Sequence, residues 1–365
     1  MAGLILLLML VVACATSPTV TRGSETTLKI IEWGWGTPEP VYIRDHVREM
    51  EQLPFDGLGL DLPADGKPPD TGSKFSWRVW GKKSLRAEDY SQAVEALKAT
   101  RFERFTDNFL RFNVTPGDVD WTGEAFSHVL ANARLAARIA KDCGLKGLLF
   151  DVEHYNGHPF SYIRQSNHER LELEDYAQRV RIRGREFMQA FNSEFEGLTI
   201  LLPLGFDLAS HDPEEYRLLA PFLDGMLEAA TPGTLIFDGW EWAYGYKNES
   251  QFEKARQIIL ERGAERTTAE VEFGRHYRAS FGLWIDYSGK VWDGEDFSKN
   301  YFTPDEFEQA VRSALKYTDR YVWIYSHKAN WWNGKVPQAY VDALRKARGM
   351  GDMSGKGEKG EKGGK

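Results

Sequence analysis

Short apolar runs and segments with helical periodicity alternate eight times between residues 27 and 350 of this sequence. Strands are expected at 28–33, 55–62, 108–114, 145–150, 198–204, 234–242, 279–287 and 320–325. Helices are expected at 41–53, 87–100, 124–143, 173–195, 214–230, 250–262, 303–317 and 337–348. Because the number and order of these segments agree and no second core is left over, the pattern predicts a single (β/α)8 TIM barrel rather than a doubly wound sheet.

Local signals mark two helix starts and one long insertion. Residues 212–215 read Asp-Pro-Glu-Glu and residues 303–306 read Thr-Pro-Asp-Glu. Each combines a capping side chain, a proline in the first turn and a glutamate three residues on, so a helix is expected to begin at both places. The polar insertion at 63–85 carries Trp77 and Trp80, and loops of this length are usually functional or mobile.

The fourth apolar run leads directly into two carboxylates. Leu148, Leu149 and Phe150 are typical of a strand buried on both faces, and Asp151 and Glu153 follow them. Because side chains alternate along a strand, these carboxylates are expected to point the same way at its carboxyl end. Ligands bind at that end of α/β sheets. The alternative is that Asp151 only opens a solvated loop.

Polar and aromatic residues also follow the other predicted strands. A barrel places its catalytic residues at the carboxyl ends of several strands. Asp238 and Glu241 follow the sixth strand and complete the candidate catalytic set with Asp151 and Glu153. So many carboxylates close together at one end of the barrel repel one another, so their presence there favours a functional reason. The candidate substrate-binding residues are Glu32, Trp33, Asp61, Asn113, Trp240, Tyr244, Trp284, Asp286, Tyr325, His327 and Trp331.

Paired carboxylates beside aromatic platforms are the residue types that glycoside hydrolysis needs. One carboxylic acid protonates the leaving oxygen while a second carboxylate attacks the sugar or activates water. We expect Glu153 to be the acid/base, with Asp151 orienting it and raising its proton affinity. The second carboxylate is expected to be Asp238 or Glu241. The 12 tryptophans can supply platforms for sugar rings, so the expected substrate is a polysaccharide or oligosaccharide.

The end of the fourth strand also resembles a known signature. Asp151-Val152-Glu153 looks like the last part of the chitinase-type glycoside hydrolase motif, in which an aspartate two residues before a glutamate assists the acid. The aromatic eighth strand, with Trp323 and then Trp331, is similar to that family's. The motif's earlier aspartates fall on Leu149 and Lys146. The resemblance therefore implies the (β/α)8-barrel glycoside hydrolase superfamily and no family within it.

Two other functions stay open at this point. A non-catalytic glycan-binding protein could keep the barrel without the activity. A metal-dependent barrel hydrolase could draw its ligands from Glu153, His154, His158, Asp238, Glu241 and His327. However, His154 has the opposite strand phase to Glu153 and the sequence has no HExxH pattern, so no metal is expected. The sequence also has no nucleophile elbow and no nucleotide-binding glycine loop, and no cofactor is expected.

The N-terminal segment predicts export. Residues 1–13 form an apolar run too short to span a bilayer comfortably, and Val11-Val12-Ala13-Cys14 resembles the bacterial lipobox. This makes 1–14 a lipoprotein-type signal peptide with Cys14 as the lipidated residue. Residues 15–26 are then a linker, 27–350 the catalytic barrel and 351–365 a disordered Gly/Lys/Glu tail. An uncleaved anchor or a misassigned start is the alternative.

Charge and cysteine content narrow the expected partners. The net charge of -8 and the pI near 5.6 argue against nucleic acid, which requires a basic surface. The expected partners are a carbohydrate and, through the lipid anchor, a membrane of the bacterial cell envelope, at the periplasm or the cell surface. We expect a monomer. Cys143, the second cysteine, is expected to be a small buried hydrophobe.

Overall fold

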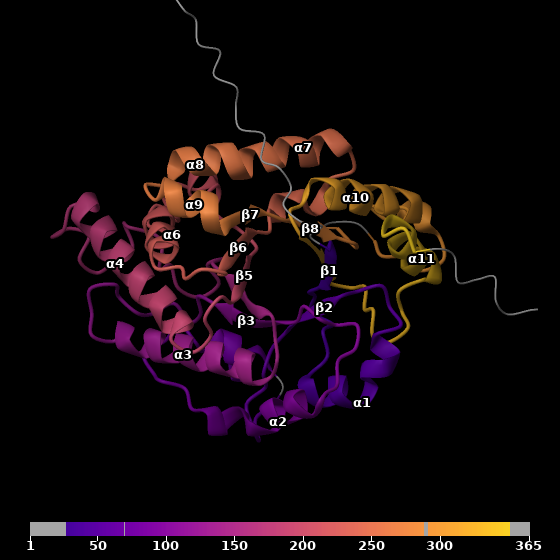
Figure 1. The fold of residues 1–365 in the computed structure, drawn as a ribbon, viewed down its shortest axis with the longest axis horizontal. Helices are drawn as coiled ribbons and strands as arrows, with labels where there is room; N and C mark the ends of the chain where they lie inside the picture. The colour runs from indigo at the N-terminus through magenta and orange to yellow at the C-terminus, as the bar shows by residue number, and fades with distance from the viewer. Residues whose placement is uncertain (1–26, 69, 288–290, 351–365) are drawn as a thin grey trace, which may run out of the picture.

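The computed structural model describes residues 27–68, 70–287 and 291–350, which form a ring of parallel strands surrounded by helices (Figure 1). The segments predicted as signal peptide, linker and tail, with Cys14, lie outside the described residues. The sheet order is β7-β6-β5-β4-β3-β2-β1-β9-β8, with parallel pairs throughout. The strands are β1 (Lys29–Glu32), β2 (Gly57–Leu60), β3 (Phe109–Asn113), β4 (Gly147–Asp151), β5 (Thr199–Leu202), β6 (Leu235–Asp238), β7 (Tyr277–Ala279), β8 (Phe281–Trp284) and β9 (Tyr321–Tyr325).

The sheet closes through a strand that is interrupted at one residue. β7 pairs with β6 and β8 pairs with β9, and only Ser280 separates β7 from β8. The Ser280 N–H donates to Asp238 O at 2.7 Å, and its hydroxyl donates to Tyr321 O at 2.8 Å. Ser280 therefore bonds to both β6 and β9, and β7 and β8 together form the eighth strand of the barrel. The predicted (β/α)8 barrel is confirmed.

Side chains alternate between the barrel interior and the surrounding helices. The interior cluster is apolar and draws on most strands: Ile31, Trp33, Phe109, Leu149, Leu201, Phe237, Tyr321 and Trp323. Glycine at an inward position makes room for the largest of these rings, since a Cβ on Gly282 would lie 2.3 Å from the Trp323 indole. The alternation fixes which strand-end residues face the barrel mouth and which face the helices.

Helices cover the outside of the ring. They are α1 (Pro40–Met50), α2 (Ser91–Ala99), α3 (Phe126–Asp142), α4 (Leu173–Asn192), α5 (Leu208–His211), α6 (Leu219–Glu228), α7 (Glu249–Gln257), α8 (Gly263–Arg266), α9 (Glu270–His276), α10 (Pro304–Tyr317) and α11 (Gln338–Ala347). Short helical turns are η1 (Thr71–Ser73), η2 (Phe75–Trp77), η3 (Ala87–Tyr90), η4 (Glu241–Gly245), η5 (Ile258–Arg262, a π-turn) and η6 (Phe297–Lys299).

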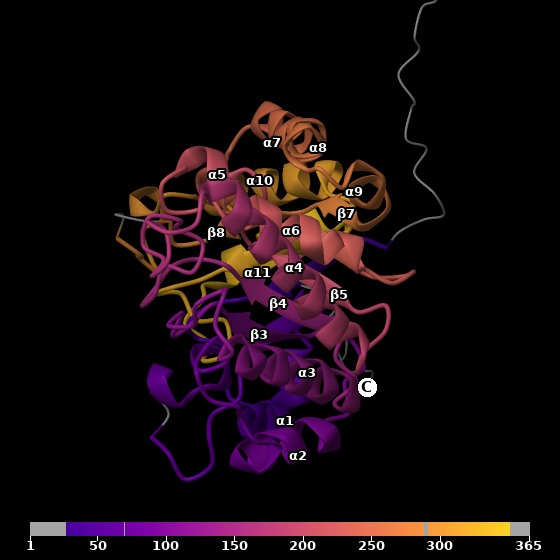
Figure 2. The same ribbon diagram turned by 90° about the vertical axis from the view of Figure 1, so that its left-hand side faces the viewer.

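Helices α3, α4 and α6 lie side by side against the sheet near β4 (Figure 2). Glycines let α4 and α6 approach each other closely. A Cβ on Gly184 would lie 2.1 Å from Phe222 O, and one on Gly225 would lie 2.0 Å from Arg181 O. Any larger residue would therefore push the two helices apart. This packing supports the wall of the barrel from which Asp151 emerges.

The capping prediction at residue 303 is confirmed, and the one at residue 212 is wrong. Thr303 Oγ1 accepts from the Glu306 N–H at 3.3 Å, and the Glu306 carboxylate accepts from the Thr303 N–H at 2.9 Å, which opens α10. By contrast, α6 begins only at Leu219. Glu215 is instead bound by His158 and Arg164. The expected cap residues therefore form a turn that contacts the loop after β4.

The insertion at 63–85 packs against the barrel. Trp80 is buried among rings that include Trp121 and Phe150, at centroid distances of 5.7 and 6.2 Å.

Cys143 is buried, as predicted, and burial raises the pKa of its thiol to about 11. Within the described ranges, no helix has the length and apolar character needed to cross a bilayer.

Candidate active site

A cavity of about 180 Å³ opens at the carboxyl ends of the strands. Side chains from at least five strand ends meet there, and they combine carboxyls, aromatic rings and one arginine. The lining residues are Trp33, Trp35, Ser76, Trp77, Arg111, Asn113, Asp151, Glu153, Tyr155, Glu241, Tyr244, Trp284 and Tyr325. We refer to this cavity as the cleft. Its position is the one that binds ligands in (β/α)8 barrels.

Asp151 and Glu153 enter the cleft from the end of β4. Leu149 fills the barrel interior, so Asp151, two residues on, points the same way. Asp151 Oδ1 accepts from the Glu153 N–H at 3.0 Å, and Oδ2 accepts from the Tyr155 hydroxyl at 2.8 Å. Burial and the charge of Glu153 raise the pKa of Asp151 to about 7. The predicted pairing of the two carboxylates on one face is confirmed.

Glu241 reaches the cleft because the chain turns sharply after β6. The strand expected at 234–242 ends at Asp238, and Trp240 adopts a left-handed backbone with φ +42°. Such a conformation strains a bulky residue, and it starts the helical turn η4, which carries Glu241 and Tyr244 into the cleft. Burial, followed by the charges of Glu153 and Asp151, raises the pKa of Glu241 to about 8.

Aromatic rings form most of the cleft wall. Trp77 and Tyr155 are 5.0 Å apart at their centroids, and Tyr244 stacks on Tyr325 at 5.5 Å. Trp35 stays 48% exposed although it lines the cleft. Exposed ring faces beside carboxyls can stack on the apolar faces of sugars.

Arg111 lines the cleft and donates to three acceptors, one in β2 and two in the loop after β1. It follows Phe109 at the inward phase of β3, and its Nε donates to Gly59 O at 2.8 Å. Its Nη2 donates to Gly34 O at 2.7 Å and to Thr37 Oγ1 at 3.1 Å. Burial lowers the pKa of Arg111 from its usual value. The guanidinium therefore fixes the segment that carries Trp33 and Trp35 and brings a positive charge to the carboxyls.

Two predicted site carboxylates face the helices instead of the cleft. Ile31 and Phe237 point into the barrel, so the next residues, Glu32 and Asp238, point outward. Glu32 is fully buried, and its Oε2 accepts from the Thr37 hydroxyl at 2.9 Å. Asp238 accepts from the Tyr277 hydroxyl at 2.7 Å and from the Trp240 N–H at 3.1 Å. The expectation that both residues line the mouth is therefore wrong, and Asp238 instead anchors the turn before Glu241.

Four further predicted residues support loops around the cleft. Asp61 accepts from the Ser76 N–H at 3.1 Å and thereby holds the insertion. Asp286 accepts from the Trp284 indole at 2.7 Å and from backbone N–H groups of residues 327–329, including His327 at 3.0 Å. Trp331 packs on Phe55 in the core at 5.0 Å. Asp61, Asp286, His327 and Trp331 do not line the cleft.

A second cavity of about 520 Å³ lies beside η4. Trp240 and Trp242 line it, and the Trp242 ring stacks on His211 at 4.4 Å. Trp240 is one of the predicted substrate-binding residues, within the strand expected at 234–242. Because the strand stops at Asp238, Trp240 lines this cavity rather than the cleft.

Sequence reasoning missed five cleft residues: Trp35, Ser76, Trp77, Arg111 and Tyr155. A signal existed for Arg111, because a charged residue between Phe109 and Asn113 at inward phase must serve the barrel mouth. Tyr155 continues the alternation of Asp151 and Glu153. Ser76 and Trp77 reach the cleft only through the folding of the insertion, which the sequence pattern does not specify.

The residues named above as possible metal ligands do not all come together in the cleft. His154 and His158 meet Glu215 instead of Glu153, and this is the single such group of three among the residues that the structure describes. Neither histidine lines the cleft, and neither does His327.

Comparison with known proteins gives a likeness in fold. No family model and no curated protein sequence matches the chain. The family 5 glycoside hydrolase PbGH5A from Prevotella bryantii B14 is 10% identical, with a TM-score of 0.48 over 86% of this chain and 88% of that one. A GH18 chitinase from Pseudoalteromonas aurantia is 11% identical, with a TM-score of 0.43 over 87% and 99%. A sugar phosphate isomerase/epimerase from Parabacteroides distasonis is 10% identical, with a TM-score of 0.40 over 87% and 97%.

The (β/α)8 barrel expected from the sequence is shown by the sheet itself, and these neighbours assign no family to the chain. Identities this low describe the fold alone. The chemistry has to be inferred from the cleft.

Proposed function

We propose that this protein is an exported glycoside hydrolase that cleaves glycosidic bonds in a polysaccharide or oligosaccharide at the cleft. The observation that carries this proposal is the meeting of Glu153 and Glu241, from two different strand ends, in one cavity with aromatic walls. Two carboxyls on opposite sides of a glycosidic bond supply the acid and the nucleophile or base of that reaction.

We assign the proton donor to Glu241. Because its pKa is raised to about 8, this carboxyl is protonated at neutral pH, and the negative charge of Glu153 helps to hold the proton there. The proton passes from Glu241 to the glycosidic oxygen as the bond to the sugar breaks. Glu153 either attacks the sugar carbon as that bond breaks, or takes a proton from a water that attacks the same carbon. In the first case, water that gives its proton to Glu241 then hydrolyses the bond between the sugar and Glu153. The sequence alone favoured Glu153 as the donor, and the same pair of residues serves either assignment.

Asp151 positions Glu153 in this account. It accepts from the Glu153 N–H at 3.0 Å and so fixes the backbone of the reacting residue. Trp35, Trp77 and Trp284 offer ring faces for sugar units, and Asn113 offers an amide for a hydroxyl.

We also propose that the protein is anchored by a lipid on Cys14. The support is the sequence of residues 1–14. Expression of the whole chain in a bacterium, followed by fractionation and mass spectrometry of the N-terminus, tests this proposal. An acylated Cys14 in the membrane fraction that is lost in Cys14→Ser supports it, and an intact Met1 contradicts it.

A panel of polysaccharides tests the activity. The protein from Ala15 onward is incubated with each, and the release of reducing ends is measured beside the binding of the same polysaccharide. Release supports hydrolysis and names the sugar. Binding of a polysaccharide without release from any member of the panel favours the glycan-binding alternative.

A further inference from the structure

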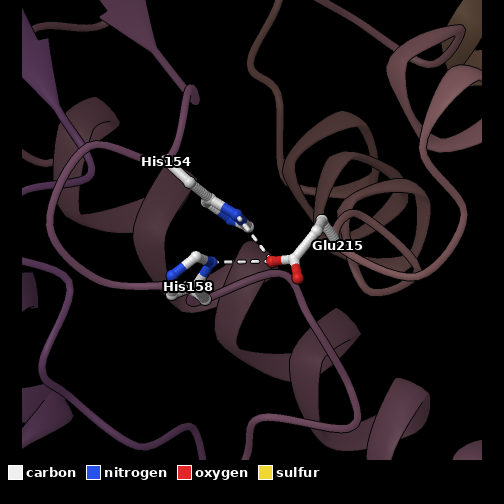
Figure 3. A group of neighbouring side chains, drawn as sticks. All are labelled: His154, His158 and Glu215. Atoms are coloured by element: carbon white, nitrogen blue, oxygen red, sulfur yellow. Dashed lines mark hydrogen bonds and ion pairs between the residues drawn. The ribbon is translucent and has the colours of Figure 1, made fainter.

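Three side chains with metal-binding atoms point toward one another beside the cleft (Figure 3). His154 and His158 come from the loop after β4, and Glu215 comes from the segment before α6. Their ligand atoms all lie within 4.8 Å of one another. Glu215 Oε2 is 2.7 Å from His158 Nδ1 and 3.7 Å from His154 Nδ1. The two rings thus converge on one carboxylate oxygen.

His154 has a buried polar atom that the protein leaves without a partner. Its side chain is 5% exposed, and its Nδ1 makes no hydrogen bond. The 3.7 Å to Glu215 is too long for one. A buried ring nitrogen without a partner is costly whether it carries the proton or a lone pair. The hydrogen bond between His158 and Glu215 gives this nitrogen of His154 no partner.

The surroundings hold the group in place. Arg164 Nε donates to Glu215 Oε1 at 2.8 Å, which leaves Oε2 facing the histidines. The His154 ring stacks on Tyr216 at 4.2 Å, and the Tyr216 hydroxyl accepts from the His154 N–H at 2.9 Å. Supporting contacts of this kind orient metal ligands in proteins.

We propose that His154, His158 and Glu215 bind one divalent transition metal ion of the zinc class, which clamps the loop after β4 to the segment before α6. Two imidazoles and one carboxylate suit zinc better than magnesium or calcium, which prefer oxygen ligands. The His158 side chain is 40% exposed, so water completes the coordination on that side.

The hydrogen bonding of His154 has to change when the metal binds. The Phe160 N–H donates to His154 Nε2 at 3.3 Å, which leaves the ring proton of the neutral imidazole on Nδ1. Coordination through Nδ1 moves this proton to Nε2 and breaks the bond from Phe160. Two N–H groups then face each other, and the metal–nitrogen bond has to offset this local cost. The change of tautomer is a signature that a plain hydrogen-bonded cluster does not have.

The site would act on structure rather than on the reaction. Glu153 directly precedes His154, so a metal at this position stiffens the loop that carries Glu153 and Tyr155 into the cleft. The proposal does not depend on glycoside hydrolysis, because metal binding is measured without a sugar.

Calorimetric titration with Zn²⁺ of metal-stripped protein, prepared without a polyhistidine tag, tests the site. We expect one equivalent to bind and to raise the melting temperature. His158→Ala and Glu215→Gln should each weaken binding by at least about 100-fold, and His154→Phe should do so while keeping the stacked ring. His46→Ala is the matched control and should bind Zn²⁺ as the wild type does. Ring ¹⁵N shifts should show the His154 proton move from Nδ1 to Nε2.

Two results would overturn the proposal. Wild-type protein that binds no stoichiometric Zn²⁺ contradicts the site outright. Binding that persists unchanged in both His158→Ala and His154→Phe places the ion elsewhere. His158 lies on the surface, so its variant should stay folded, and circular dichroism checks this.

Discussion

The backbone N–H of Glu153 donates to the Oδ1 of Asp151, two residues earlier, at 3.0 Å. This bond ties the backbone of Glu153 to the end of a buried strand, and the Tyr155 hydroxyl donates to the other oxygen of Asp151 at 2.8 Å. Asp151 lines the cleft, and both of its carboxylate oxygens are engaged by these hydrogen bonds. In the proposed mechanism, Asp151 therefore positions Glu153 and is not itself the second reacting group.

Tyr155→Phe tests this positioning role. The change removes the O–H that donates to Asp151 and stabilises its charged form, so the pKa of Asp151 should rise further. The loss of one hydrogen bond to a charged group predicts a fall in kcat of about tenfold, with KM nearly unchanged. The ring is 41% exposed, so the fold should survive. Tyr42→Phe on α1 is the control, and equal effects of both changes on kcat would argue against the role.

The pH dependence of kcat/KM should show a basic limb at about 8. Burial and the nearby carboxylates raise the pKa of Glu241 to about 8, and the donor must be protonated to act. Activity should therefore be present below this pH and be lost as the pH rises through it. Rates measured from about pH 5 to about pH 10 give the limb directly. A rate that stays level through this whole range would remove Glu241 from the role of donor.

Glu241 should also affect how the free energy of unfolding depends on pH. The sign of this effect is opposite to that of an ordinary ion-paired carboxylate. The pKa of Glu241 is higher in the folded than in the unfolded protein, so the folded state binds more protons and loses stability as the pH rises from about 4.5 to about 8. Glu241→Gln removes this penalty. We expect it to raise the free energy of unfolding at pH 9 by about 1 kcal/mol or more, with little gain at pH 5. Urea denaturation at both pH values measures this, and a gain of equal size at both would contradict it.

Arg111→Lys should destabilise the protein although the charge is kept. Arg111 reaches Gly34 O, Gly59 O and Thr37 Oγ1 from two nitrogens, and a single ammonium cannot span these acceptors. We expect a loss of about 2–4 kcal/mol in the free energy of unfolding, because buried carbonyls are left without donors.

Arg138→Lys supplies the control for that measurement. Arg138 pairs with Glu194 at 2.8 Å on the surface, and its replacement should cost less than about 1 kcal/mol. Comparable losses for the two variants in urea would show that Arg111 has no special bridging role.

The sequence predicts the barrel well because each strand and helix carries its own local pattern. It predicts the β4 site for the same reason, since Asp151 and Glu153 follow an apolar run without interruption. The sequence does not place Glu32 and Asp238 correctly, because their strands are apolar on both faces and the alternation alone does not say which face is inward. Only the closed sheet assigns them to the helix side.

Glu241 and Glu215 show where tertiary contacts override local signals. The sequence after β6 favours a longer strand, and the left-handed backbone of Trp240 ends it. The acidic residues at 212–215 look like a helix start, and contacts with His158 and Arg164 recruit Glu215 elsewhere. Neither outcome can be read from neighbouring residues, because the partners lie far away in the chain.

The most direct test is the rate of reducing-end release by Glu153→Gln and Glu241→Gln, with the polysaccharide that the panel identifies. Glu32→Gln is the control, because this carboxyl is buried at the end of a barrel strand but faces the helices instead of the cleft. Both cleft variants should lose at least about 100-fold in rate, the lower end of what general acid–base catalysis contributes, while Glu32→Gln should stay near wild type. A wild-type rate in either cleft variant would contradict the two-carboxylate mechanism.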